Sequence, residues 1–124
     1  MRMKIRIFTL LLILSAYLVN GQSGWQRKAD FPGTIRFGAV GFSINGKGYI
    51  TTGKNTSLGI FRDLWEFDPI SNTWTQKADF PGIARVNAIG FSIGTKGYIG
   101  TGGNNVFLKD FWEYEPANNT WNQK

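Results

Sequence analysis

The 124-residue sequence contains no cysteine and no histidine. Without cysteine the chain has no disulfide, no thiolate metal site, no thiol nucleophile and no lipid-modified lipoprotein N-terminus. Without histidine it has no imidazole to serve as a general base or metal ligand. No apolar run reaches the roughly 20 residues that a membrane-spanning helix needs. We therefore expect no cofactor and no metal, and a fold that is held together by packing.

The N-terminus has the pattern of a secretory signal peptide. Three basic residues come first, and an apolar run over residues 7–19 follows them. Small residues at the end of this stretch suit signal peptidase, with cleavage after Gly21. The sequence predicts a signal peptide over residues 1–21 and export of residues 22–124 to the periplasm, cell surface or exterior. An uncleaved N-terminal anchor is the alternative.

The net charge of +6 overstates the charge of the mature protein. Removal of the signal peptide would leave 11 basic and 8 acidic residues, a net charge of +3. These cations are scattered along the sequence, whereas a nucleic-acid surface needs a stripe or cluster of them. We expect no nucleic-acid partner, and contact with a membrane only during export.

A duplication dominates what remains. The first copy occupies about residues 25–73 and the second about residues 74–120, with about 26 of 47 aligned positions identical. The start of a third copy follows at residues 121–124. A repeat of this period indicates one supersecondary unit stacked on copies of itself.

Each copy predicts four short strands and no helix. In the first copy Asn45 and Gly46 separate two apolar stretches, and Asn-Gly is a strong signal for a tight hairpin. The first strand is apolar or small on both faces, which suits a sheet covered on both sides by neighbouring sheets. The expected strands cover residues 38–44, 48–53, 63–68 and 73–78, then 87–93, 97–102, 110–115 and 120–124.

The spacing of an arginine, an apolar strand, a tyrosine and a tryptophan about 25 residues later resembles the kelch repeat. These residues are Arg36, Tyr49 and Trp74 in the first copy, and Arg85, Tyr98 and Trp121 in the second. The second copy also has the diglycine of the kelch pattern, where the first has glycine and lysine. The resemblance implies an all-β fold, a partial kelch-type β-propeller with two four-stranded antiparallel blades plus one orphan N-terminal strand at residues 25–29.

Kelch propellers have more blades than two, so we expect this chain to be part of a longer propeller. The alternative is a short protein whose copies assemble into a closed ring. Two blades leave sheet faces and edges open to water, and such surfaces favour self-association.

Repeated aromatic and acidic residues are interpreted as structural. The four tryptophans at equivalent positions predict packing between blades. Asp63 and Glu66 return as Asp110 and Glu113, and identical copies argue against one active site. We expect these acids to cap turns or to pair with basic residues, and we assign no catalytic residue.

By the kelch resemblance, the loops at one end of the blades bind the partner. The candidate ligand-binding residues are Arg36, Arg85, Lys54, Asn55, Asn104 and Asn105. The predicted function is a secreted, non-catalytic binding or interaction module for a protein or glycan. The alternative is a fragment of a secreted carbohydrate-active kelch enzyme, similar to the sialic acid mutarotases or the galactose oxidases.

Overall fold

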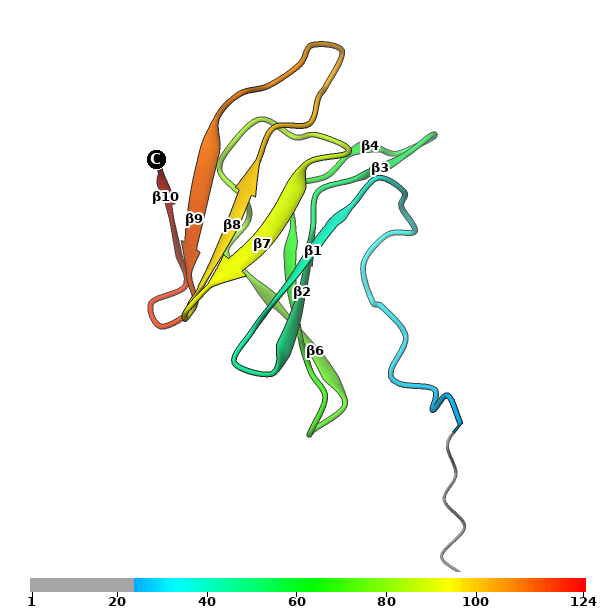
Figure 1. Ribbon diagram of the computed structural model, residues 1–124. Coiled ribbons are helices and arrows are strands. Elements are labelled where there is room, and N and C mark those ends of the chain that lie inside the picture. The colour runs from blue at the N-terminus through cyan, green and yellow to red at the C-terminus, as the bar shows by residue number, and fades with distance from the viewer. Residues whose placement is uncertain (1–23) are drawn as a thin grey trace, which may run out of the picture.

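A computed structural model describes residues 24–124, so the predicted signal peptide lies outside the described residues. These residues form two four-stranded antiparallel sheets and one two-stranded hairpin (Figure 1). The first sheet has the order β1 (Val40–Ile44), β2 (Lys47–Thr51), β5 (Leu64–Asp68) and β6 (Thr73–Lys77). The second has β7 (Ile89–Ile93), β8 (Lys96–Gly100), β9 (Phe111–Glu115) and β10 (Thr120–Gln123). The hairpin joins β3 (Lys54–Asn55) to β4 (Gly59–Ile60).

The structure confirms the all-β class and the partial β-propeller. Each four-stranded sheet is a meander whose strands follow one another in chain order, as in a propeller blade. We call the first sheet blade 1 and the second blade 2. Within residues 24–124, no helix has the length and hydropathy needed to cross a bilayer.

The predicted hairpin turn is confirmed at the start of blade 1. Asn45 and Gly46 both have positive φ, 50° and 77°, as a type I′ turn requires. The next strand ends earlier than predicted. Thr52 and Gly53 also have positive φ, 61° and 88°, and this backbone leaves the ladder after Thr51.

The core lies between the two blades. β1 packs against β7 and β8, and Figure 1 shows the two sheets side by side. Blade 1 covers blade 2 with one face only, so β1 alternates between buried and exposed residues. The expectation that this strand is buried on both faces is therefore wrong for blade 1 in this structure. The buried apolar cluster consists of Val40, Phe42, Ile44, Tyr49, Leu64, Ile99 and Tyr114.

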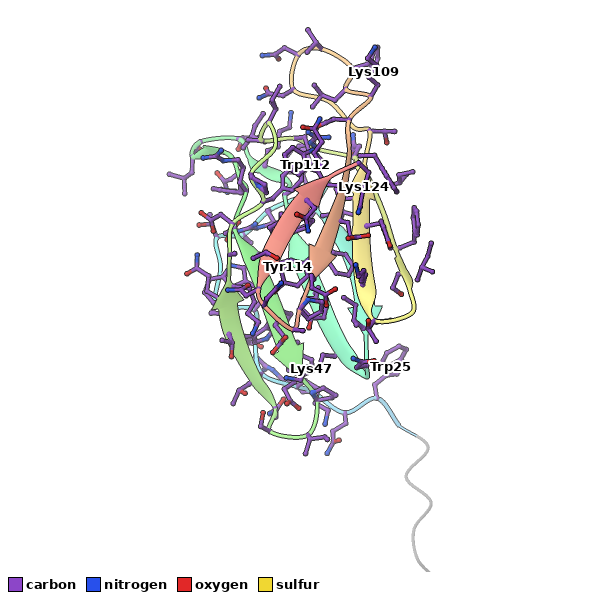
Figure 2. All side chains as sticks on the ribbon, turned by 90° about the vertical axis from the view of Figure 1, so that its left-hand side faces the viewer. Trp25, Lys47, Lys109, Trp112, Tyr114 and Lys124 are labelled. Carbon is purple, nitrogen blue, oxygen red and sulfur yellow. The ribbon has the colours of Figure 1, made fainter. Side chains whose placement is uncertain are left out.

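Residues 25–29 form no strand, contrary to the sequence prediction. An isolated strand has no ladder partner for its backbone groups, and Trp25 extends clear of the sheets (Figure 2). The end of this segment is nevertheless attached to blade 1. The backbone N–H of Ala29 donates to Oδ1 of Asn72 at 2.9 Å, and Nε1 of Trp74 donates to the Ala29 carbonyl at 3.1 Å.

The same attachment recurs between the blades. The N–H of Ala78 donates to Oδ1 of Asn119 at 2.9 Å, and Nε1 of Trp121 donates to the Ala78 carbonyl at 3.1 Å. Because Ala78 follows the last strand of blade 1, this attachment ties blade 1 to blade 2. We call these two arrangements the entry clips of blades 1 and 2.

A phenylalanine completes each entry clip. Phe80 is fully buried, and its ring packs edge-on against Trp112 and Trp121 with centroids 5.6 and 5.2 Å apart. Phe31 packs in the same way on Trp65 and Trp74 in blade 1. The repeated tryptophans thus have a packing role, but their phenylalanine partners come from the segment that enters the blade.

We expect Phe80→Ala to lower the free energy of unfolding by about 3–5 kcal/mol, because a buried aromatic ring leaves a cavity. Phe107→Ala is the matched control, since Phe107 is fully exposed and its removal should change stability by less than about 0.5 kcal/mol. Urea unfolding measures both values. Equal stability of the two variants would contradict the packing role of Phe80.

Candidate functional site

The candidate site lies at the end of the blades opposite the β1–β2 turn. Figure 2 shows the two ends, with Lys109 on the loop between β8 and β9 and Lys47 beside the turn. The β3–β4 hairpin of blade 1 and the β8–β9 loop of blade 2 share this end (Figure 1). We call it the loop end.

Both candidate arginines make buried ion pairs. Nη1 and Nη2 of Arg36 donate to the two carboxylate oxygens of Asp63 at 2.6 and 2.8 Å. Arg85 holds Asp110 in the same way at 2.7 and 2.6 Å. The side chains of Arg36 and Arg85 are only 4% and 0% exposed. This confirms that the repeated aspartates pair with basic residues.

The backbone is shaped to fit each arginine. Nη1 of Arg36 donates to the Thr52 carbonyl at 3.1 Å, and Nη1 of Arg85 donates to the Thr101 carbonyl at 2.9 Å. Both threonines have positive φ, near 60°, which is unfavourable for a β-branched residue. This unfavourable backbone conformation occurs in both blades, and in each it points the threonine carbonyl at the arginine guanidinium. The arginines therefore hold the strand ends and loops in place.

Asn55 is also used within the fold. Its Nδ2 donates to the Ile35 carbonyl at 3.0 Å, and its Oδ1 accepts from the N–H groups of Ser57 and Leu58. These contacts close the turn between β3 and β4. Three of the six predicted ligand-binding residues, Arg36, Arg85 and Asn55, thus have internal partners.

The other three candidates line one hollow. Lys54, Asn104 and Asn105 surround a cavity of about 630 Å³ between the β3–β4 hairpin of blade 1 and the β8–β9 loop of blade 2. Their side chains form no hydrogen bond with another described residue, although the Lys54 ammonium lies 5.2 Å from the ring centroid of Phe37. Lys54 is the one ionisable side chain among the described residues that line the hollow. Its remaining lining residues are Ile60, Val86, Asn87, Thr101, Gly102, Gly103, Val106, Phe107 and Leu108.

Contacts between the blades fix the shape of this hollow. The N–H of Asn87 donates to the Gly38 carbonyl at 2.9 Å, and the N–H of Gly53 donates to the Arg85 carbonyl at 2.9 Å. The residues that precede β1 and β3 of blade 1 are thereby joined to the segment that precedes β7 of blade 2. The hollow is lined by asparagines and by apolar residues.

Sequence reasoning missed Asn87 and Phe107 as lining residues. A signal for Asn87 was present, because it occupies the repeat position of Gly38 and shares its positive φ, 55° against 64°. Asparagine and glycine are the residues that adopt this conformation most readily. Phe107 lies in the β8–β9 loop, which is two residues shorter than the corresponding loop of the first copy, and the repeat pattern gave no signal for it.

A second repeated cluster lies away from the loop end. Tyr98 and Lys96 donate to the carboxylate of Glu113, and Lys124 lies 3.1 Å from the same group. The hydrogen bonds from Lys96 and Lys124 lower the pKa of Glu113 to about 2. Burial raises the pKa of Tyr114, which lies on β9 of blade 2 and packs on Tyr49 of blade 1, to about 12. These groups stabilise the blades.

The described part of the chain holds no cluster of three or more acidic side chains that suits a metal ion. Since cysteine and histidine are absent from the whole sequence, the oxygen ligands of acids would be the main donors for a metal. Each buried acid at the loop end already has an arginine partner.

Two comparisons with known proteins extend this description. The sequence is 40% identical over 59 residues to an N-acetylneuraminate epimerase of Yersinia enterocolitica, a match covering 43% of this chain and 15% of the epimerase. The solved structure of YjhT superimposes with a TM-score of 0.68 and 19% identity, over 81% of this chain and 41% of YjhT. No family model matches the sequence. Together these likenesses support a kelch-like β-propeller, and the chain spans less than half of either relative.

We expect Arg85→Ala to lower the free energy of unfolding by about 3–5 kcal/mol, because it leaves the Asp110 carboxylate without its partner. Arg27→Ala is the matched control, since its ion pair with Asp30 is exposed and such pairs contribute about 1 kcal/mol or less. Urea unfolding measures both variants. An Arg85 variant as stable as the control would show that this ion pair does not hold the loop end.

A second prediction concerns pH. The folded-state pKa of Glu113 lies below its ordinary value of 4.5, so its ionised form stabilises the fold above pH 4.5. This contribution disappears as the pH falls toward about 2. The stability difference between the native chain and Glu113→Gln should therefore shrink over that range in urea unfolding curves. A difference that does not depend on pH would contradict the assignment.

Proposed function

We propose that the chain is a secreted binding module of the kelch-like type whose loop end takes an acidic sugar. The observation that carries this proposal is the hollow at the loop end, which brings together one cation, three asparagines and several apolar side chains. Most binding sites combine an apolar surface with a few convergent polar groups in this way. We also propose that residues 1–21 are a signal peptide and that the remaining chain is exported.

Each part of the hollow suits one part of such a ligand. The ammonium of Lys54 would pair with a carboxylate, and no lining residue of the described chain carries a negative charge. The amides of Asn87, Asn104 and Asn105 each offer two donors and an acceptor, which suit sugar hydroxyls. Phe107, which is fully exposed, offers an apolar surface for the C–H face of a sugar ring.

In this proposal Arg36 and Arg85 do not contact the ligand but hold the loops in position. Their guanidinium groups are engaged by aspartates and backbone carbonyls. The ligand contacts are assigned to Lys54, Asn104 and Asn105, with Asn55 closing the hairpin that presents Lys54. We further propose that these two blades act within a larger propeller, whose other blades come from a longer chain or from other copies of this one, since the chain spans 41% of YjhT.

The alternative function is a part of a carbohydrate-active enzyme. The observation that favours it is the 40% identity to an N-acetylneuraminate epimerase over 59 residues. Sugar epimerisation requires proton transfer, and the hollow offers only Lys54 as an ionisable group among the described residues. Binding without catalysis is therefore the better-supported proposal for this chain.

Calorimetric titration with N-acetylneuraminate tests the proposal, with neutral N-acetylmannosamine as the comparison ligand. We expect Lys54→Gln to weaken binding of the acidic sugar about 10- to 100-fold, because a hydrogen bond to a charged group contributes about 1.5–3 kcal/mol. Lys28→Gln, a change of the same charge at an exposed position outside the hollow, should leave binding unchanged.

Equal binding of the two sugars, or an unaffected Lys54→Gln variant, would contradict the assigned role of the cation. The same samples address the alternative. Faster exchange between the anomers of N-acetylneuraminate in the presence of the native chain, observed by NMR, would favour the enzyme.

A further inference from the structure

The two blades differ most in the exposure of equivalent apolar side chains. Three alternate residues of β1 are buried against blade 2, whereas their repeat equivalents on β7 face solvent. The exposed fractions are 6, 9 and 2% for Val40, Phe42 and Ile44, against 55, 39 and 63% for Ile89, Phe91 and Ile93. We call the β7 residues the apolar ridge of blade 2. Blade 2 therefore exposes the kind of surface that blade 1 buries.

The surface that receives such a ridge is built from glycines. In blade 2, Val40 and Phe42 of blade 1 lie over Gly90 and Gly97. A Cβ atom on Gly90 would lie 2.5 Å from Cγ2 of Val40, and one on Gly97 would overlap the Phe42 ring. Only glycine permits this approach of the two sheets. We call such a glycine pair a seat.

Blade 1 carries the same seat on its exposed face. Gly41 and Gly48 are the repeat equivalents of Gly90 and Gly97. A Cβ atom on Gly48 would meet nothing nearer than Cβ of Phe67, at 3.9 Å, and one on Gly41 would meet only the Tyr49 carbonyl, at 3.3 Å. Within residues 24–124, no contact with a neighbouring sheet requires glycine at these two positions.

An aromatic contact follows the same pattern. Tyr49 of blade 1 packs on Tyr114 of blade 2, with ring centroids 5.8 Å apart. Among the described residues Tyr98, the equivalent of Tyr49, has no partner ring from another sheet, and Phe67, the equivalent of Tyr114, lies half-buried beside the seat of blade 1. The exposed face of blade 2 thus carries a ridge and a tyrosine, and the exposed face of blade 1 carries the matching seat and a phenylalanine.

We propose that a second copy of this chain docks its seat on the apolar ridge, so that the contact between blades inside the chain is repeated between copies. The second copy is the favoured occupant because its seat has the same glycines, at equivalent repeat positions, as the seat that already receives β1 inside the chain. This inference does not depend on the proposed ligand.

The contact joins two different surfaces, so it is heterologous, and each copy has one ridge and one seat to offer. Heterologous contacts form rings when the rotation between copies closes. Because propellers have about 4 to 8 blades, a ring of two-blade chains holds two to four copies. In such a ring each apolar ridge is covered by a seat.

Sedimentation analysis of the purified chain over a range of concentrations tests the proposal. We expect one closed species of two to four times the chain mass. Gly48→Val should give a folded monomer, because a Cβ atom at this position has room within the chain and the added side chain blocks the seat. Gly24→Val adds the same side chain at an exposed position with no neighbour within 4 Å, and should not alter the assembly.

The ridge is tested by Ile93→Lys, at a position 63% exposed within the chain, which should also give a folded monomer. A mixture of Gly48→Val and Ile93→Lys should form a dimer and nothing larger, because one intact ridge and one intact seat remain. A native chain that stays monomeric while folded would overturn the proposal. So would association that survives Gly48→Val, open-ended polymers of the native chain, or a mixture that fails to dimerise.

Discussion

The structure depends on the packing of large apolar side chains over glycines. Phe42 and Val40 lie where Cβ atoms of Gly97 and Gly90 would stand, so the two sheets approach more closely than ordinary side chains permit. This spacing brings the backbone of blade 1 within hydrogen-bond distance of blade 2 at the loop end, where the N–H of Gly53 meets the Arg85 carbonyl. The walls of the hollow therefore have fixed positions because the sheets beneath them do.

The basic residues of the loop end have two different roles: the arginines hold the loops in place, and Lys54 faces the hollow. The arginines of the loop end are buried with aspartates, and hydrogen bonds from Arg85 lower the pKa of Asp110. Lys54, a neighbour of these groups in the fold, remains available at the hollow. A planar guanidinium suits a bidentate carboxylate, whereas an ammonium on a flexible stem suits a ligand that arrives from solvent. This division explains why the arginines repeat in both blades while the loops beside them differ in length and composition.

Much of the fold could be predicted from the sequence because the duplication and the turn at Gly46 are local signals. The strand ends could not, because positive φ at Thr52 is imposed by an arginine 16 residues away. The hairpin that presents Lys54 was predicted only as a loop, since its two strands are two residues each. The six candidate residues were predicted to share one end of the blades, and they lie together at the loop end, where their binding role stays a prediction. The sequence could not show which asparagines have internal partners. Asn55 and Asn104 occupy equivalent repeat positions, yet only the side chain of Asn55 closes its own turn.

The entry clips have a consequence for the order in which the chain acquires structure. Each blade is fastened by the segment that precedes it, through Ala29 for blade 1 and Ala78 for blade 2. During synthesis every blade therefore meets its fastening segment before its own last strand leaves the ribosome. Domains that emerge first generally fold first, and this connectivity lets one blade close without waiting for any later residue. A repeat fastened from its C-terminal side would instead expose its tryptophans until the next repeat had been translated.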